Sequence, residues 1–343
     1  MLKYFKSSLY VTFGGLFLVV GIISYQTGSV PLVMQALLTV TLLSILEISL
    51  SFDNAVVNAT VMKTMSEIWK KRFLTWGMLI AVFGMRLFFP LLIVSILGQV
   101  NPFEALKLSI YNPARYAEIM VSSHLYVAGF GGIFLFMVFV HFFVNDEKDV
   151  HWISFLEKPL AKTAKFKGIE IMLTLAVLLL FTEILPQSYD KYGFLTAGLS
   201  GVLTFLVVHG ISDYLENEEI VTDANRIVAS TGLGTFLYLE VLDASFSFDG
   251  VVGAFALTNS LFLIMVGLSI GAFFVRSLTI YFVEKNTVDQ FKYLEHGAFY
   301  ALGTLSLIML SSSFLHISEW ITGLSGLIIL SLSVYFSIKS KAE

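Results

Sequence analysis

The sequence has no cysteine and few charged residues, and both shortages restrict what the protein can be. Without cysteine, the chain of 343 residues forms no disulfide, binds no metal through thiolates and uses no thiol in catalysis. Only 13% of its residues are charged, about half the share of a soluble domain, whereas 57% are hydrophobic and the mean hydropathy is +0.83. This composition is that of a polytopic membrane protein.

Signals for nucleic acid binding and for secretion are also lacking. The net charge of −4 is small, and no basic stripe with interspersed aromatic residues suggests a nucleic acid partner. The apolar run 9–23 is followed by Ser-Tyr-Gln-Thr-Gly-Ser and not by a small-x-small cleavage site, so we interpret it as a first membrane span.

Long apolar runs, in contrast, are abundant. A transmembrane helix needs about 20 mostly apolar residues, and we predict ten such spans in one all-helical transporter domain that covers residues 1–343. The predicted spans are 8–25, 32–60, 73–97, 125–144, 169–187, 193–210, 228–257, 261–282, 297–315 and 320–338. The second and seventh are too long for one straight crossing, so we expect each to be tilted, broken near its acidic residues or extended beyond the lipid.

The distribution of positive charge predicts the orientation, because Lys and Arg collect in cytoplasmic loops. Of the 21 Lys and Arg residues, Arg86 and Arg276 lie within predicted spans. If both termini are cytoplasmic, only Lys107, Arg115 and Lys191 fall outside, and the other sixteen (21 − 2 − 3) fall inside. This asymmetry favours ten spans with both ends in the cytoplasm, in the cell inner membrane.

Two similar motifs place carboxylates inside apolar spans. Glu47 and Asp53 lie in the second span, within Leu-Glu-Ile-Ser-Leu-Ser-Phe-Asp-Asn. Asp243 and Asp249 occupy the matching positions of the seventh span, within Leu-Asp-Ala-Ser-Phe-Ser-Phe-Asp-Gly. An ionisable group in the membrane is costly and usually has a partner or a function.

The predicted orientation makes the two motifs antiparallel. The second span runs inward and the seventh runs outward, and each is followed by a span that contains one arginine. We therefore predict a three-plus-three inverted repeat, with repeat A over about 32–144 and repeat B over about 228–315. Spans 5 and 6, over about 169–210, are additions, and spans 1 and 10 are peripheral. Inverted repeats place substrate near the midplane.

The candidate site offers only oxygen ligands. Such sites suit magnesium, calcium and manganese better than zinc or copper, and carboxylates that face one another take up protons when the cation leaves. The candidate ligands are Asp53, Asp249, Glu47, Asp243, Glu240 and Asn54, with Arg86 and Arg276 as charge-balancing or gating partners. Glu47 and Asp53 are six residues apart, about 240° around a straight helix, so they share a ligand only if the helix unwinds between them.

Several alternatives stay open at this stage. The acids could form structural ion pairs with the two arginines, in a membrane scaffold or stress-complex subunit. An intramembrane aspartyl protease also needs two facing aspartates, but both copies here read Ser-Phe-Asp, without that class's Tyr-Asp and Gly-x-Gly-Asp, and we expect no enzyme. His141 and His151 bracket an acidic stretch, 145–149, that could receive metal or be a solvated loop. The oligomeric state is not encoded in these patterns.

The same motifs resemble those of the TerC family, within the LysE-like group of transporters. The resemblance is carried by Glu47-x5-Asp53-Asn54, by Glu240-Val-Leu-Asp243-x5-Asp249 and by the element Phe-Lys-Tyr-Leu-Glu-His-Gly that ends at Gly297. It departs where Gly250 replaces the usual serine and in the extra spans 5 and 6. The resemblance implies divalent metal export, manganese first, with the acidic motifs as ion site and no permanent cofactor. It also implies a link to tellurite resistance.

Overall fold

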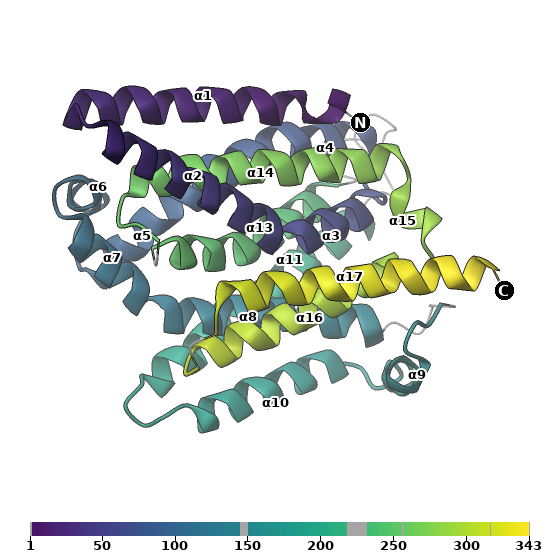
Figure 1. The fold of residues 1–343 in the computed structure, drawn as a ribbon. Coiled ribbons are helices and arrows are strands. Elements are labelled where there is room, and N and C mark those ends of the chain that lie inside the picture. The colour runs from purple at the N-terminus through teal and green to yellow at the C-terminus, as the bar shows by residue number, and fades with distance from the viewer. Residues whose placement is uncertain (1, 145–149, 218–231, 256, 316, 343) are drawn as a thin grey trace.

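The computed structural model describes residues 2–144, 150–217, 232–255, 257–315 and 317–342, without the side chains of 2, 213, 215–217, 248, 249, 319 and 342. These residues form an all-helical bundle in which long helices run roughly parallel or antiparallel (Figure 1). Within this part of the chain the structure has no strand, as predicted.

The long helices and their short neighbours follow one another along the chain. In the first half they are α1 (Leu2–Thr27), α2 (Val30–Leu50), α3 (Phe52–Met62), α4 (Glu67–Arg72), the π-helices η1 (Phe73–Gly77) and η2 (Ile80–Phe88), α5 (Phe89–Leu97), α6 (Pro102–Tyr111), α7 (Pro113–Ser122) and α8 (His124–Val144). In the second half they are α9 (Ser154–Thr163), α10 (Ile169–Ile184), α11 (Lys191–Asn217), α13 (Leu233–Ala254), α14 (Leu261–Glu284), α15 (Thr287–Gln290), α16 (Leu294–Ser312) and α17 (Glu319–Ala342).

Seven helical stretches in the described residues are long and apolar enough to cross a membrane. They are Lys3–Thr27, Val30–Leu50, Glu67–Leu97, His124–Val144, Lys191–Ser212, Leu261–Glu284 and Trp320–Lys341. The other three predicted spans coincide with α10, α13 and α16, of which α10 has only 16 residues and α13 carries three acidic residues. The protein is thus an all-helical, multi-pass membrane protein, and the count of ten spans stays a prediction.

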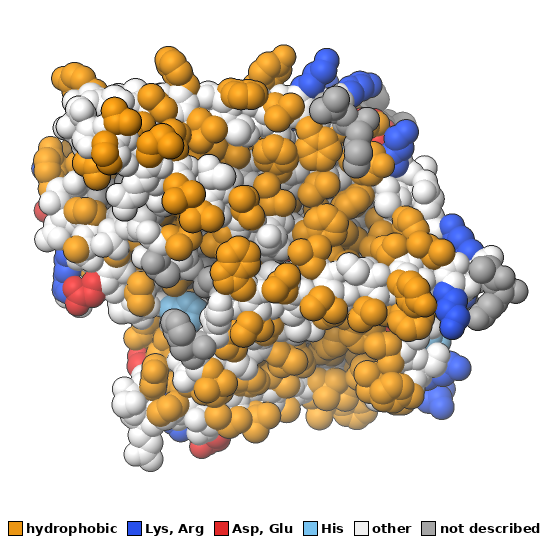
Figure 2. Space-filling model, in the orientation of Figure 1, with side chains coloured by type: hydrophobic (Ala, Val, Ile, Leu, Met, Phe, Trp, Pro, Cys, Tyr) orange, Lys and Arg blue, Asp and Glu red, His pale blue; other side chains and the backbone are white. Residues whose placement is uncertain are grey.

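The surface agrees with a membrane environment. Hydrophobic side chains cover much of the visible face, whereas Lys and Arg gather at the end of the bundle where both chain termini lie (Figures 1 and 2). At the opposite end, the short helices α6 and α7 connect α5 to α8. The side chain of Asn101 caps α6 by accepting a hydrogen bond from the Glu104 amide at 2.9 Å.

The core is built around α8, which packs against α10, α11, α13 and α16. Phe134, Leu135 and Met137 of this helix are fully buried. On the other side of α13, helices α2, α3, η2 and α14 pack together, and α17 packs on α16, α2 and α3. The helices of the two acidic motifs therefore lie in the interior of the bundle, and Glu47, Asp53 and Glu240 are buried there.

The second and seventh predicted spans differ in the structure. Ser51 separates α2 from α3 with φ −108° and ψ 14°, so the first motif helix is interrupted between its two acids, one of the expected options. Hydrogen bonds continue across the interruption, from Ser51 N to Glu47 O at 3.0 Å and from Ala55 N to Ser51 O at 3.2 Å. In the second half, α13 runs without a break through Glu240 and Asp243.

Candidate functional site

A stripe of polar residues follows one face of α2 and α3. Glu47, Ser51, Asn54 and Asn58 are separated by four, three and four residues, the spacing that keeps side chains on one side of a helix. All four are buried, with exposures between 2% and 5%. Polar groups at this depth need partners or ligands, so the stripe marks a site and not an accident of composition.

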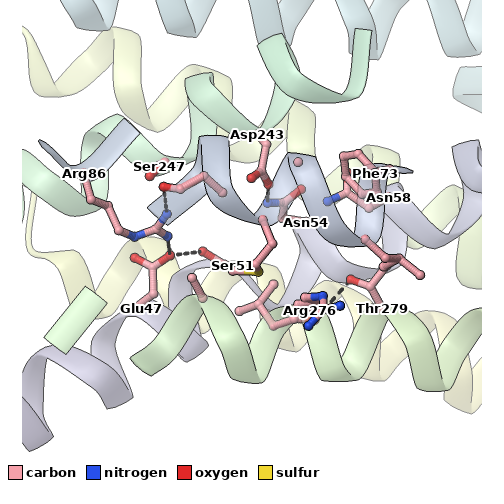
Figure 3. Close-up of a pocket in the computed structure, with 16 residues that line it drawn as sticks. Glu47, Ser51, Asn54, Asn58, Phe73, Arg86, Asp243, Ser247, Arg276 and Thr279 are labelled. Carbon is pink, nitrogen blue, oxygen red and sulfur yellow. Dashed lines mark hydrogen bonds and ion pairs between the residues drawn. The ribbon is translucent and has the colours of Figure 1, made fainter. Parts of the chain in front are cut away.

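A second stripe lies on α13. Glu240, Asp243 and Ser247 are three and four residues apart and share a face of that helix. Glu240 is 8% exposed and Ser247 is 4% exposed. The two stripes face each other, because the Asn54 Nδ2 group donates a hydrogen bond to Asp243 Oδ1 (Figure 3). This contact joins the two sequence motifs across 189 residues of chain.

The stripes line a cavity of about 50 Å³ inside the bundle. It has room for a few water molecules, or for a cation with part of its hydration shell. Its walls come from both motif helices, both π-helices and α14. The lining residues are Glu47, Ser51, Asn54, Asn58, Phe73, Leu74, Gly77, Met78, Ala81, Arg86, Asp243, Ser247, Ala272, Val275, Arg276 and Thr279.

One carboxylate of the cavity is already neutralised. Arg86 Nη2 forms an ion pair with Glu47 Oε1, and both side chains are 3% exposed. Ser51 Oγ donates to the same oxygen at 3.2 Å, and Arg86 Nη1 donates to Ala81 O at 2.6 Å within η2. Because a charge this deep must be paired, Glu47 is held by Arg86 in this conformation and has little free charge for a cation.

Other oxygens in and beside the cavity have no hydrogen-bond partner among the described groups. They are Asn54 Oδ1, Asn58 Oδ1, Glu240 Oε1 and Ser247 Oγ. Glu240 lies next to Gly77, since a Cβ at that glycine would collide with Glu240 Oε1. Unpartnered buried oxygens are costly, and together with Asp243 they form an oxygen-lined cradle. Such a cradle suits a hard cation that keeps some of its water.

The predicted ligands divide into those the structure brings together and those it does not. Asn54 and Asp243 meet in the cavity, and Glu47 lies there in its ion pair. Asp53 points elsewhere, because a Cβ at Gly326 of α17 would lie 3.4 Å from Asp53 Oδ2. The interruption at Ser51 therefore does not unite Glu47 with Asp53.

For Asp249, the position lies in α13 but its side chain lies outside the described residues, so its predicted role stays a prediction. In the part of the chain that is described, no group of three or more His, Asp or Glu side chains is arranged to hold a metal ion. A cation in the cavity would consequently depend on amide, hydroxyl and water oxygens beside the carboxylates.

Both predicted arginines line the cavity, but they differ. Arg86 is buried and ion-paired, whereas Arg276 of α14 is partly buried, has no ion pair with a described residue and leaves its Nε without a hydrogen-bond partner. Among the described side chains, the expected pairing of arginine with a motif acid is therefore present in the first half only.

Sequence reasoning missed several residues of the site. Asn58 and Ser247 line the cavity with unpartnered oxygens, and Ser51 and Thr279 line it as well. The spacing that could have found Asn58 and Ser247 was present in the sequence, since each continues a polar stripe by four residues.

The two inner histidines have different neighbours. His141 packs against His209, with ring centroids 4.5 Å apart, whereas His151 Nδ1 lies 3.3 Å from Glu157 Oε2. Glu157 also accepts a hydrogen bond from Tyr300 at 3.0 Å. Residues 145–149, the acidic part of that prediction, lie outside the described residues.

Comparison with known proteins gives a family. Residues 52–343 match the family described as a protein of unknown function, DUF475. The chain belongs to this family. It is also 29% identical over 80 residues to the uncharacterized membrane protein YceF of Bacillus subtilis (strain 168). That match covers 23% of this chain and only 30% of the relative. No solved structure matches the chain.

These relatives support a membrane protein and no particular activity. The match begins at Phe52, so it includes the stripe on α13 and both arginines, but of the first stripe only Asn54 and Asn58. The resemblance to the TerC family is not what this match names, and it enters only as part of the proposal below.

Proposed function

We propose that this protein is a secondary transporter that moves a divalent cation, manganese first, out of the cytoplasm across the cell inner membrane, coupled to protons. The observation that carries the proposal is the cradle of unpartnered oxygens and carboxylates inside a membrane bundle. Asp243, Glu240, Asn54, Asn58 and Ser247 are its ligands, directly or through water. The protein has no enzymatic role and no permanent cofactor in this proposal.

The charge of the site favours a cation. Glu47, Asp243 and Glu240 bring three carboxylates, against two guanidinium groups of Arg86 and Arg276. Because Glu47 and Arg86 neutralise each other, Asp243 and Glu240 remain against Arg276 among the described side chains. A divalent cation would balance the excess when bound, and protons would balance it when the cation leaves.

The inverted repeat that transport needs is supported by matching contacts. Glu47 corresponds to Asp243 and Asn54 corresponds to Gly250 in the motif alignment. Asn54 contacts Asp243, and in the counterpart contact a Cβ at Gly250 would lie 3.1 Å from Glu47 Oε2. The same alignment pairs Ser44 with Glu240 and Gly267 with Gly77. In each half the motif residue contacts the glycine of the other half.

In the first of these contacts, Ser44 Oγ donates to Gly267 O at 3.0 Å. In the second, its counterpart Glu240 lies against Gly77. These paired contacts support an approximately two-fold relation between the halves. This is the arrangement in which rocking of one repeat against the other gives alternating access, and it agrees with the resemblance to the TerC family.

A non-transporting membrane scaffold is the second candidate, and one observation favours it. The buried Glu47–Arg86 pair links the second and third predicted spans, as a structural staple would. An intramembrane protease has no such support, because Asp53 lies outside the cavity.

The test is metal flux into proteoliposomes that contain the purified protein alone. We would impose a pH gradient and compare Mn²⁺, Mg²⁺, Ca²⁺ and Zn²⁺. The wild type should move Mn²⁺ in response to the gradient, Asp243→Asn should not, and the matched control Asp289→Asn should retain the wild-type rate. Asp289 is exposed and remote from the cavity. The absence of flux for every cation would reject transport and favour the scaffold.

A further inference from the structure

The equivalent arginines of the two halves, Arg86 and Arg276, lie in different helix types and have different partners. Arg86 lies in η2, a π-helix of nine residues, where its Nη1 donates to Ala81 O and its Nη2 pairs with Glu47. Arg276 lies in α14, a regular α-helix of 24 residues. It reaches the same cavity, but among the described residues it has no acidic partner.

The correspondence of the halves predicts a contact that this conformation lacks. Glu47 corresponds to Asp243 and Arg86 to Arg276, so the counterpart of the pair Glu47–Arg86 is a pair Asp243–Arg276. Here Asp243 accepts a hydrogen bond from Asn54 instead (Figure 3). The site is therefore asymmetric in its contacts although the two halves correspond in sequence.

We infer that Arg276 is a positioning residue that pairs with Asp243 in the opposite-facing state, while Arg86 releases Glu47. The inference rests on the proposed function, whose two states it describes. In an inverted-repeat transporter each half adopts the conformation of the other when access alternates. Exchange of the partners keeps one buried carboxylate paired in each state, which avoids the cost of stranding two charges.

The π-helix supplies the structural means. A π-turn contains one more residue than an α-turn, so conversion of η2 to an α-helix turns Arg86 by about 100° away from Glu47. Conversion of α14 from an α-helix to a π-helix turns Arg276 in the opposite sense, towards Asp243. Two glycines of α14 pack closely on the first motif helix, Gly267 against Leu43 and Gly271 against Glu47. Because glycines present no side chain, α14 can change its helical form there without a clash.

Arg276 then competes with the metal for Asp243. In the present state Asp243 has a neutral amide partner and is available to a cation. When Arg276 arrives, the cation loses that ligand and leaves on the other side. Each arginine thus displaces the ion from the acid of its own half, and transport requires both arginines although binding in this state requires only Arg86.

The first test separates binding from transport. Arg276→Gln should bind Mn²⁺ in detergent at least as tightly as wild type, because the substitution removes a positive charge from the cavity wall, but its flux in proteoliposomes should fall at least about tenfold. Arg276→Lys, which keeps the charge, should restore most of the flux. Full flux in Arg276→Gln, or equal loss in Arg276→Gln and Arg276→Lys, would overturn the inference.

The second test does not depend on metal. The chain has no cysteine, so Ala272→Cys would introduce a single reactive group at the buried wall of the cavity. A membrane-impermeant maleimide should label it from both sides of oriented vesicles. In Arg276→Gln it should label from one side only, because the state in which Arg276 holds Asp243 is lost.

Two-sided labelling in Arg276→Gln, or one-sided labelling without that substitution, would overturn the inference. If labelling alternates as expected but no divalent cation is transported, the proposed function fails and the exchange of ion pairs stands. The two failures are therefore distinguishable.

Discussion

The helix of the first motif is interrupted and its Glu47 is ion-paired, whereas the helix of the second motif is continuous and its described acids, Glu240 and Asp243, form no ion pair. In the first half, Ser51 interrupts the helix and Arg86 reaches Glu47 from a π-helix. In the second half, α13 and α14 are regular and Arg276 has no acidic partner in the described structure. Nearly the same motif therefore occurs in two conformations, which agrees with the proposed exchange between two access states.

The largest loss of stability should come from breaking the Glu47–Arg86 ion pair in the first half. Arg86→Met would leave the buried Glu47 carboxylate without its partner, at a cost of about 3–5 kcal/mol. Thermal unfolding in detergent should therefore show a strong loss of stability. The double variant Glu47→Gln with Arg86→Met should recover most of it, and Arg115→Met, which removes an exposed ion pair, should change little. A stable Arg86→Met protein would show that the pair does not hold the first half.

Gly267 and Gly77 are equivalent in the two halves, but substitution by alanine should affect protein stability differently at the two positions. A Cβ at Gly267 would lie 2.6 Å from Leu43 Cβ and 3.2 Å from Val40 O, so Gly267→Ala should cost about 1–3 kcal/mol through overpacking. At Gly77 the added carbon would meet the flexible end of Glu240, so Gly77→Ala should lower metal flux more than stability. Gly21→Ala, with no neighbour within 4 Å, is the control for both. Equal stability losses at positions 267 and 77 would contradict the comparison.

How far the sequence predicted these features depends on the kind of feature. The hydropathy pattern predicted helices where the structure has them, because burial in lipid and in the core both demand apolar runs. The interruption near Glu47 was among the expectations. The π-helix was not, since neither the glycines nor the apolar residues of 80–88 differ from those of an ordinary span.

The orientation of the acids was the harder problem. Glu47 faces the cavity because Gly250 and Gly271, more than 200 residues away in the chain, leave space for its side chain. Asp53 faces α17 because Gly326 does the same there. Such contacts between distant glycines and acids are set by packing, which the motif does not encode. The stripe that continues to Asn58, in contrast, was available from spacing alone.

Removing Asn58, a neutral ligand of the cradle, should weaken metal transport less than the changes above. Asn58→Ala removes one unpartnered oxygen that belongs to the first half and has no equivalent in the second, where Ala254 takes its place. Loss of one such ligand should cost about 1 kcal/mol, or roughly a fivefold rise in KM for Mn²⁺, with little change in maximal flux. Ala254→Gly, which leaves the cradle intact, is the control. An unchanged KM would remove Asn58 from the site.

The smallest effect should come from the exposed link between the halves. Lys63 Nζ lies 2.6 Å from Asp289 Oδ1, with side chains 35% and 62% exposed. Surface pairs contribute little, so Asp289→Asn should shift the unfolding temperature in detergent by no more than about 1–2 °C. A shift as large as that of Arg86→Met would mean that this exposed pair, and not the buried one, holds the two halves together.

The most direct test of the central claim compares two acids that the sequence ranks together and the structure separates. Mn²⁺ flux in proteoliposomes would be measured side by side for Asp243→Asn, which alters the cavity, and Asp53→Asn, which does not line it. The account predicts at least about a tenfold loss for Asp243→Asn and a clearly smaller loss for Asp53→Asn. Wild-type flux in Asp243→Asn would contradict it.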